Sequence, residues 1–479
     1  MHQGTAIAVI GDHDRLSFAQ LWAHIGQISV DLRQLGIVPG VVVGLRFRDP
    51  LRHLVLSLSL LKEGITQVAL PSRESIAVQE KIAGITGVAV IIGDVMEPIL
   101  EGWGLVSLDS EWRLKGNGAS VPLAVSPADG PALIFLGSGT TGQPKVIAVD
   151  FALLAHLVER DLAVRDFKSG ERHYCESSLD YYTAKRRTLG CLAAGVTVML
   201  PHELPRRLVD YCLSHNIQHV SLTASQAMAL LLREREFSTP DFPRLPFLRS
   251  MFVGSSPVSE VVRKCLRQLI SGQLFVVYGS NEFGEATVAS PLDQDQAPGA
   301  VGRACPGVLL EVVDDSGNAC AAGTNGSIRL RSAPMMHAYH VLSSDSARNF
   351  RDGWYYPGDM GWLTEDGNLV FSGRRDDMMI YRGVNIYPRE IEAVLESHPA
   401  VSEVATFPLL TETGENLPFA VVCASGVSEA ELLKFCQTHL GWRRPRRIFF
   451  ANELPRNSAG KVLKRVLAEK VKGLLLGKA

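Results

Sequence analysis

The sequence predicts an α/β protein with a large N-terminal body and a small α+β C-terminal domain. Apolar strand-like runs alternate with amphipathic helical segments to beyond residue 220, which is typical of mostly parallel α/β layers. Between about residues 297 and 372 the pattern changes to short segments separated by Asp-Gly and Ala-Gly turns, which indicates a small β unit. The last hundred or so residues mix helical and strand patterns over a normal domain length. We therefore expect one domain over 1–375 and another over 376–479, with the boundary near Asp376.

The expected elements follow from apolar periodicity and from turn residues. Ser17 fits the N-cap of an apolar helical stripe, and Gly36 fits its stop. Strands of the N-terminal body are expected at 41–43, 67–70, 88–92, 132–136, 197–200 and 220–222, with a helix at 51–63. Strands of the β unit are expected at 309–313 and 327–330. In the C-terminal domain we expect helices at 390–395 and 429–439 and strands at 403–407 and 419–424.

Composition and charge indicate a protein that acts on small molecules. Hydrophobic residues make up 46% of the chain, and 48 basic residues nearly balance 50 acidic ones. No net field therefore attracts nucleic acid or an anionic membrane surface. No apolar run approaches the roughly 20 residues that span a bilayer. The segment MHQG at 1–4 lacks a basic stretch followed by an apolar one, so we expect a cytoplasmic protein.

Cysteine and histidine spacing gives no sign of a structural metal site. The eight cysteines are scattered without a C-x-x-C pair, so we expect reduced and mostly buried thiols. His337 and His340 have a ligand-like spacing, but no cysteine or histidine cluster accompanies them. Structural zinc is not expected.

A glycine-rich loop follows the expected strand at 132–136. The segment GSGTTGQPK at 137–145 matches the letters of the dinucleotide fingerprint G-x-G-x-x-G. That fingerprint must open a helix, whereas residues 146–149 form a β-branched run that predicts a strand. A Walker-type loop also fails, because Lys145 does not directly follow the last glycine. Backbone N–H groups, hydroxyls and one lysine can still bind polyphosphate. A simple hairpin turn is the alternative for this loop taken alone.

The loop opens a series of five ordered segments that resembles the adenylate-forming (AMP-binding) superfamily of acyl-CoA synthetases, nonribosomal adenylation domains and luciferases. The segments are GSGTTGQPK at 137–145, YGSNE at 278–282, Gly358-Asp359, GRRD at 373–376 leading into RGVNIYPREIE at 382–392, and LPRNSAGK at 454–461. The resemblance implies ATP-dependent activation of a small carboxylic acid with Mg²⁺, followed by transfer to CoA or to the phosphopantetheine of an acyl or peptidyl carrier protein.

The resemblance implies a nucleotide site made from several segments. Its expected members are Ser138, Gly139, Thr140, Thr141, Gly142, Lys145, Gly254, Ser255, Ser256, Tyr278, Gly279, Asp359 and Arg374. Tyr278 would stack on adenine, Asp359 would accept from both ribose hydroxyls, and Arg374 would reach the ribose or a phosphate. Glu282 would bind magnesium, with Asn281 beside it. Without the resemblance, Tyr278 reads as a core aromatic, Asp359 as a turn residue and Glu282 as a solvated acid.

The same resemblance assigns catalysis to the C-terminal domain. Lys461 would bridge the carboxylate and the α-phosphate when this mobile domain closes over the nucleotide. Asp376 matches the hinge about which the domain rotates, and the loop at Gly383 would line the thiol tunnel. A surface linker and an exposed lysine are the alternatives from composition alone.

The sequence departs from the family pattern, and its substrate signals are few. Gly137, Asn281, Pro357 and Ile380 replace residues usual in the family. Tyr182 stands where domains that activate amino acids keep an aspartate, so Tyr181 and Tyr182 are expected to contact an aryl or acyl chain. The basic run at 185–187 reads either as a solvated face or as a site for a second anionic group. A catalytically weak AMP- or ATP-binding protein is the second hypothesis, and a nicotinamide-dependent oxidoreductase is the third.

Overall fold

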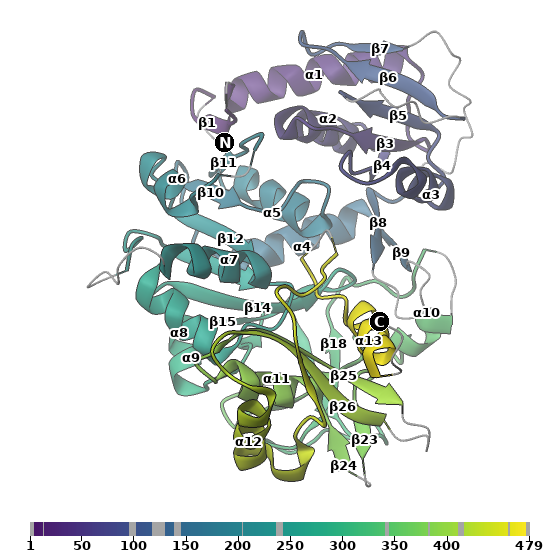
Figure 1. Cartoon of the computed structure of the whole chain (residues 1–479). Helices are drawn as coiled ribbons and strands as arrows, with labels where there is room; N and C mark the ends of the chain where they lie inside the picture. Colours follow the sequence, from purple (N-terminus) through teal and green to yellow (C-terminus); the bar gives the residue numbers. More distant parts are fainter. Residues whose placement is uncertain are drawn as a thin grey trace.

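The computed structural model confirms the predicted α/β class. It describes residues 4–12, 14–94, 102–116, 130–137, 145–203, 205–235, 243–340, 344–381, 384–410, 416–457 and 460–475. Figure 1 shows two sheets and their helices in the upper and middle parts of the molecule and the C-terminal elements below them. No helix in these ranges is long and apolar enough to cross a membrane.

The first large sheet has seven strands among the described residues, and its inner strands run parallel as predicted. Its order is β7-β6-β5-β3-β4-β8-β9. The strands are β3 (Val42–Arg46), β4 (Thr66–Ala69), β5 (Val90–Gly93), β6 (Gly104–Leu108), β7 (Leu114–Gly116), β8 (Leu133–Gly137) and β9 (Lys145–Val149). Its helices are α1 (Phe18–Gln34), α2 (Pro50–Lys62) and α3 (Ile76–Thr86). Ser17 caps α1 through a capping box, as its position predicts.

The second large sheet has nine strands in the described part of the chain, in the order β16-β15-β14-β13-β12-β10-β11-β1-β2. The strands are β1 (Ile7–Ile10), β2 (Arg15–Ser17), β10 (Arg172–Cys175), β11 (Thr197–Met199), β12 (His219–Thr223), β13 (Ser250–Gly254), β14 (Leu274–Ser280), β15 (Gly284–Ala289) and β16 (Arg303–Ala304). Its helices are α4 (Phe151–Ala163), α5 (Tyr182–Ala193), α6 (Leu208–Ser214), α7 (Ala224–Arg235), α8 (Glu260–Leu269) and α9 (Pro291–Gln296). Within this sheet, neighbouring strands from β14 across to β1 run parallel to one another, and the edge strands run antiparallel to their neighbours.

The β unit predicted near residues 297–372 is an antiparallel sheet, in which each strand runs antiparallel to the strands beside it. Its elements are β17 (Leu309–Val313), β18 (Gly326–Arg331), α10 (Ser344–Asn349), β19 (Phe350–Arg351), β20 (Trp354–Tyr355), β21 (Asp359–Leu363) and β22 (Leu369–Arg374).

The C-terminal module begins with a two-stranded ribbon, β23 (Met379–Tyr381) and β24 (Val384–Ile386). Its remaining elements are α11 (Pro388–Glu396), β25 (Val401–Leu410), β26 (Asn416–Ala424), α12 (Glu429–Leu440), η1 (Gly441–Arg443), β27 (Ile448–Phe450) and α13 (Lys464–Leu475). Strand β26 pairs antiparallel with β25 and parallel with β27. The predicted helices and strands of this region are therefore present.

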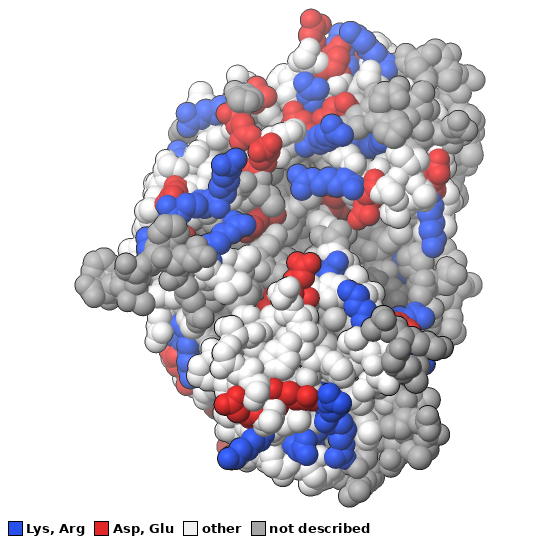
Figure 2. All heavy atoms as spheres, viewed as in Figure 1, with Lys and Arg blue, Asp and Glu red and all other residues white. Residues whose placement is uncertain are grey.

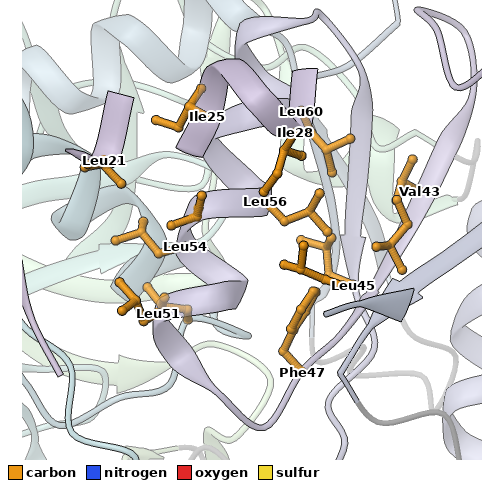
Figure 3. Close-up of a cluster of buried hydrophobic side chains, with 14 of the residues drawn as sticks. Leu21, Ile25, Ile28, Val43, Leu45, Phe47, Leu51, Leu54, Leu56 and Leu60 are labelled. Carbon is orange, nitrogen blue, oxygen red and sulfur yellow. The ribbon is translucent and has the colours of Figure 1, made fainter. Parts of the chain in front are cut away.

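One apolar cluster joins the two large sheets. Figure 3 shows side chains of α1, β3 and α2, among them Ile28, Leu45 and Leu56, pointing toward one another. The same cluster contains Val9 of β1 and Val198 of β11 from the other sheet. Because these side chains share one core, the two sheets hold each other in place.

The second feature of the interior is a cluster of buried ions beneath the hairpin of β14 and β15. Glu285 accepts hydrogen bonds from both terminal nitrogens of Arg165, at 2.9 and 2.7 Å, and from Arg187 at 3.2 Å. Arg186 donates to Asp161 at 2.6 Å. The predicted solvated face at 185–187 is wrong, because Lys185, Arg186 and Arg187 are all buried. By contrast, Figure 2 shows acidic and basic side chains interspersed on the outer surface.

We predict that Glu285→Ala destabilises the fold by about 3–5 kcal/mol, because it leaves buried guanidinium groups without their counter-charge. Asp295→Ala is the control, since Asp295 pairs with Arg267 through two hydrogen bonds of 2.6 and 3.1 Å on the surface. An exposed pair contributes less than about 1 kcal/mol. Urea unfolding followed by tryptophan fluorescence measures both, and equal shifts of the two midpoints would contradict the prediction.

Candidate functional site

Tyr278 and Asp359 meet where the nine-stranded sheet contacts the β unit. The Tyr278 hydroxyl donates to Asp359 Oδ2 at 2.7 Å, and Arg374 donates to Asp359 Oδ1 at 3.0 Å. Strands β21 and β22 place Asp359 opposite Arg374. Burial raises the pKa of Asp359, while Arg374 and the Tyr278 hydrogen bond oppose that rise. Two donors thus hold a largely buried carboxylate in a fixed orientation.

Beside this carboxylate, two glycines allow neighbouring backbone segments to lie very close to each other. A Cβ on Gly254, the last residue of β13, would lie 2.9 Å from the Val277 carbonyl oxygen. A Cβ on Gly279 would lie 2.2 Å from the Gly284 carbonyl oxygen. Since β13 and β14 are parallel neighbours, the turn at 254–256 lies next to the strand that holds Tyr278. This is the placement expected for an adenine pocket, and the adenine role stays a prediction.

The lysine of the glycine-rich loop and the predicted metal ligand share one partner. Lys145 begins β9, and its Nζ donates to the Tyr339 hydroxyl at 3.3 Å. The same hydroxyl donates to Glu282 Oε1 at 3.0 Å. The loop residues Ser138, Gly139, Thr140, Thr141 and Gly142 lie outside the described residues. At the strand end before them, a Cβ on Gly137 would lie 3.0 Å from Ile147 Cδ1, so a larger residue there would require the Ile147 side chain to shift.

The carboxylates of Glu282 and Asp359 both affect the pKa of one buried phenol, that of Tyr355. Both carboxylates contribute to raising the pKa of Tyr355 well above its usual value, although burial is the larger cause. Glu282 is half-buried and Asn281 exposed in the turn between β14 and β15. The two segments predicted to bind metal and ribose therefore converge on one region.

The acidic residue of this region, Glu282, is of the kind that holds magnesium in nucleotide sites. Within the described ranges there is no group of three or more His, Cys, Asp or Glu side chains arranged to hold a metal ion. Mg²⁺ in nucleotide sites is held by one or two carboxylates together with phosphate oxygens and water. Glu282, with one oxygen oriented by Tyr339, is a donor of that kind. All eight cysteines are free, and five of them are buried, as expected for reduced thiols.

Lys461 is brought to this region from the C-terminal module. Its backbone N–H donates to Asn457 Oδ1 at 2.9 Å in a tight turn. Partial burial and the Arg374 guanidinium lower the pKa of Lys461, while Asp377 and Asp359 oppose the change. A Cβ on Gly460 would lie 2.3 Å from Ser225 Oγ, so the loop rests directly on the start of α7. Figure 1 shows this yellow segment extending from the C-terminal module toward the large body.

The predicted hinge and tunnel residues are only partly described. Asp376 accepts a hydrogen bond from Arg348 at 2.5 Å on the surface. Nearby, Asn325 donates to the Tyr387 hydroxyl at 3.2 Å, across the expected boundary. Gly383 lies outside the described residues. The hinge role of Asp376 stays a prediction.

The two tyrosines expected to contact the acid differ in their surroundings. Tyr182 stacks on Phe135 with ring centroids 4.3 Å apart and an interplanar angle of 10°. It lies in an apolar cluster with Leu157 and Tyr339. Tyr181 is half-buried at the N-cap of α5. The structure therefore places Tyr182 in the core beside the Lys145 contact, and its substrate role stays a prediction.

Sequence reasoning missed Tyr339, Ser225 and Glu285. Tyr339 lies in a segment without a recognised motif, so no local signal marked it. Ser225 becomes relevant only because a distant glycine rests on it. Glu285 follows Glu282 by three residues, and the arginines that bury it come from α5 and from the segment that follows α4.

Comparison with known proteins finds relatives by family model, by sequence and by fold. A family model described as AMP-binding enzyme matches residues 1–340, and a second, described as AMP-binding enzyme C-terminal domain, matches residues 390–461. An indoleacetate–CoA ligase of Aromatoleum aromaticum is 31% identical over 76% of this chain and 71% of its own length. The fatty acid–[acyl-carrier-protein] ligase ScoC of Streptomyces coeruleorubidus is 26% identical over 98% of this chain and 95% of its own. The solved amide bond synthetase McbA of Marinactinospora thermotolerans has the same fold, with a TM-score of 0.84 and 24% identity over 98% of this chain and 97% of its own.

Proposed function

The chain belongs to the AMP-binding enzyme family, and we propose that it joins an acyl or aryl carboxylic acid to AMP and then transfers the acyl group to a thiol. The observation that supports this most is the convergence of Tyr278, Asp359 and Lys461, which come from the large body, the β unit and the C-terminal module. The thiol would belong to CoA or to the phosphopantetheine of a carrier protein. Both acceptor types occur in the names of the relatives.

In the first step a carboxylate oxygen of the acid attacks the α-phosphorus of ATP. The bond from that phosphorus to its bridging oxygen breaks, and pyrophosphate leaves. Negative charge gathers on the phosphate oxygens, so cations in fixed positions stabilise the transition state. We assign the β- and γ-phosphates to Lys145 and the glycine-rich loop, and the α-phosphate and the acid to Lys461. Magnesium held at Glu282 would supply further positive charge to the phosphates.

In the second step the thiol sulfur attacks the acyl carbon, the thiol proton is lost, and AMP leaves. The nucleotide is held throughout by Asp359 on the ribose and by Tyr278 on adenine. A cavity of about 310 Å³ lies between α7 and the C-terminal residues Glu403 and Arg456. Rotation of the module about Asp376 between the two steps is part of the same proposal.

A catalytically weak AMP- or ATP-binding protein of the same fold is the alternative. The departures at Gly137 and Pro357 favour it, because glycine and proline supply no side-chain hydroxyl to the nucleotide, whereas the amide of Asn281 can still donate to a phosphate. The side chain at Ile380 lies outside the described residues.

The two hypotheses differ in an exchange assay. We predict that the chain incorporates labelled pyrophosphate into ATP when the correct acid is present, because the first step is reversible. The acids to test are aryl acetates and fatty acids of graded length, since the relatives are named for such acids. ATP binding measured by calorimetry in parallel is the control. Binding without exchange across the panel would favour the alternative.

We predict that Lys461→Ala slows pyrophosphate exchange by about 10² to 10³, the usual cost of losing one group that stabilises the transition-state charge. Thioester formation from a supplied acyl-adenylate should change much less, because the module has then rotated. Lys470→Ala is the matched control, since Lys470 is an exposed lysine of α13. An equal loss in both half-reactions would contradict the assignment.

Gly460→Ala tests the closed position itself. Gly460 has φ +77°, and an added Cβ would lie 2.3 Å from Ser225 Oγ, so closure would become strained. Left-handed backbone costs a residue with a side chain roughly 1–2 kcal/mol, which corresponds to a 5- to 30-fold slower exchange. Adding Ser225→Ala should restore part of the rate, because it removes the closest atom and leaves the Ser225 Cβ position at 3.4 Å. Unchanged exchange in Gly460→Ala would show that the loop does not close in this way.

A further inference from the structure

The hydroxyl of Tyr339 occupies a junction of three chain segments. It donates to Glu282 Oε1 at 3.0 Å, accepts from Asn349 Nδ2 at 3.0 Å and accepts from Lys145 Nζ at 3.3 Å. Lys145 is 194 residues away in sequence and Glu282 is 57 residues away. One oxygen atom therefore links the lysine of the glycine-rich loop to the acid of the β14–β15 turn.

The hydrogen-bonding capacity of a phenol explains why this arrangement is directional. A tyrosine hydroxyl has one proton to donate and two lone pairs that accept. The N–H groups of Asn349 and Lys145 point at the lone pairs, so the single proton is directed at Glu282. The Glu282 carboxylate is thereby held by one oxygen in a defined orientation.

The ring that presents this hydroxyl is rigid. Tyr339 is only 3% exposed, and its ring meets Phe350 edge to face with centroids 5.4 Å apart. Its backbone N–H donates to Ser346 Oγ at 3.1 Å, and the next N–H, of His340, donates to the Val146 carbonyl at 2.9 Å. The second contact fixes this segment to the strand that begins with Lys145.

The Lys145 ammonium also lies over the Tyr339 ring, with Nζ 5.0 Å from the ring centroid. The ring face and the hydroxyl together keep the ammonium close to the carboxylate with the phenol between them. A direct ion pair would neutralise both groups and would have to be broken before each met its own partner. The phenol avoids that cost while fixing the positions of both charges.

We propose that Tyr339 is a positioning residue that aligns Glu282 for the magnesium ion and Lys145 for the phosphates of the same MgATP. The inference rests on the proposed roles of Glu282 and Lys145, and it adds a residue that touches neither the metal nor the nucleotide. Tyr339 acts on ATP binding through the orientation of these two side chains.

The test is calorimetric titration of ATP into the full chain, once with Mg²⁺ and once with EDTA. The gain in ATP affinity that Mg²⁺ provides is the quantity compared. Tyr339→Phe removes only the hydroxyl and keeps the ring packing, so we expect this gain to fall about tenfold, the scale of one hydrogen bond to a charged group. The thermal unfolding midpoint of each variant is recorded alongside.

Tyr356→Phe is the matched control, because it removes another buried tyrosine hydroxyl, one that accepts from Arg329 at 3.2 Å. It should leave the Mg²⁺ gain unchanged. Glu282→Gln should lower the gain by itself, and Tyr339→Phe should then add little to it, because residues that act through one another are not additive.

The outcomes separate this inference from the function on which it rests. If Glu282→Gln lowers the Mg²⁺ gain and Tyr339→Phe does not, the inference is overturned and the metal role of Glu282 stands. If Tyr339→Phe lowers the gain equally with and without Glu282→Gln, the tyrosine has a structural role only, which also overturns the inference. If Glu282→Gln leaves the gain intact, the metal assignment fails first.

Discussion

The buried carboxylate of Asp359 is the constraint on which the rest of the site depends. A carboxylate removed from water is costly unless donors replace the lost hydration, and Tyr278 and Arg374 supply them at 2.7 and 3.0 Å. Tyr278 belongs to the nine-stranded sheet, whereas Asp359 and Arg374 both belong to the β unit, so the Tyr278–Asp359 bond also fixes the β unit against the large body. Arg374 in turn influences the pKa of Lys461. One polar contact thus sets the position of three segments that come together only in the folded chain.

The β14–β15 hairpin connects this carboxylate to the second part of the site. Tyr278 lies near the end of β14, and Glu282 lies in the turn that follows. The turn is fixed from below, because Arg160 donates to the Phe283 carbonyl and Glu285 is held by Arg165 and Arg187. It is fixed from the side by Tyr339. A rigid hairpin therefore keeps Tyr278 and Glu282, the residues proposed to contact adenine and magnesium, at a constant separation, which is what preorganised catalysis requires.

Sequence patterns were sufficient for the features that are local in the chain. The β-branched run at 146–149 predicts a strand and disfavours a dinucleotide fold, whose fingerprint opens a helix, and the structure has the strand β9, which pairs antiparallel with β8. Ser17 was readable as a cap because capping uses residues three positions apart. The burial of the basic run at 185–187 was not readable, because its counter-charges Asp161 and Glu285 lie on other elements. Tyr339 was missed for the same reason, since its partners are far away in sequence.

The buried ions beneath the hairpin have an electrostatic consequence for the site. The described residues there include four guanidinium groups, Arg160, Arg165, Arg186 and Arg187, but only two carboxylates, Asp161 and Glu285. Buried charge is stable only when it is compensated, and the excess here is positive. Arg160 and Arg186 lie close to Gly284, directly behind the turn that holds Glu282. A positive interior at this point favours anions on the outer side of the turn. The proposed function places the polyphosphate of ATP on that side. The same cluster that stabilises the fold would therefore also strengthen the binding of nucleotide.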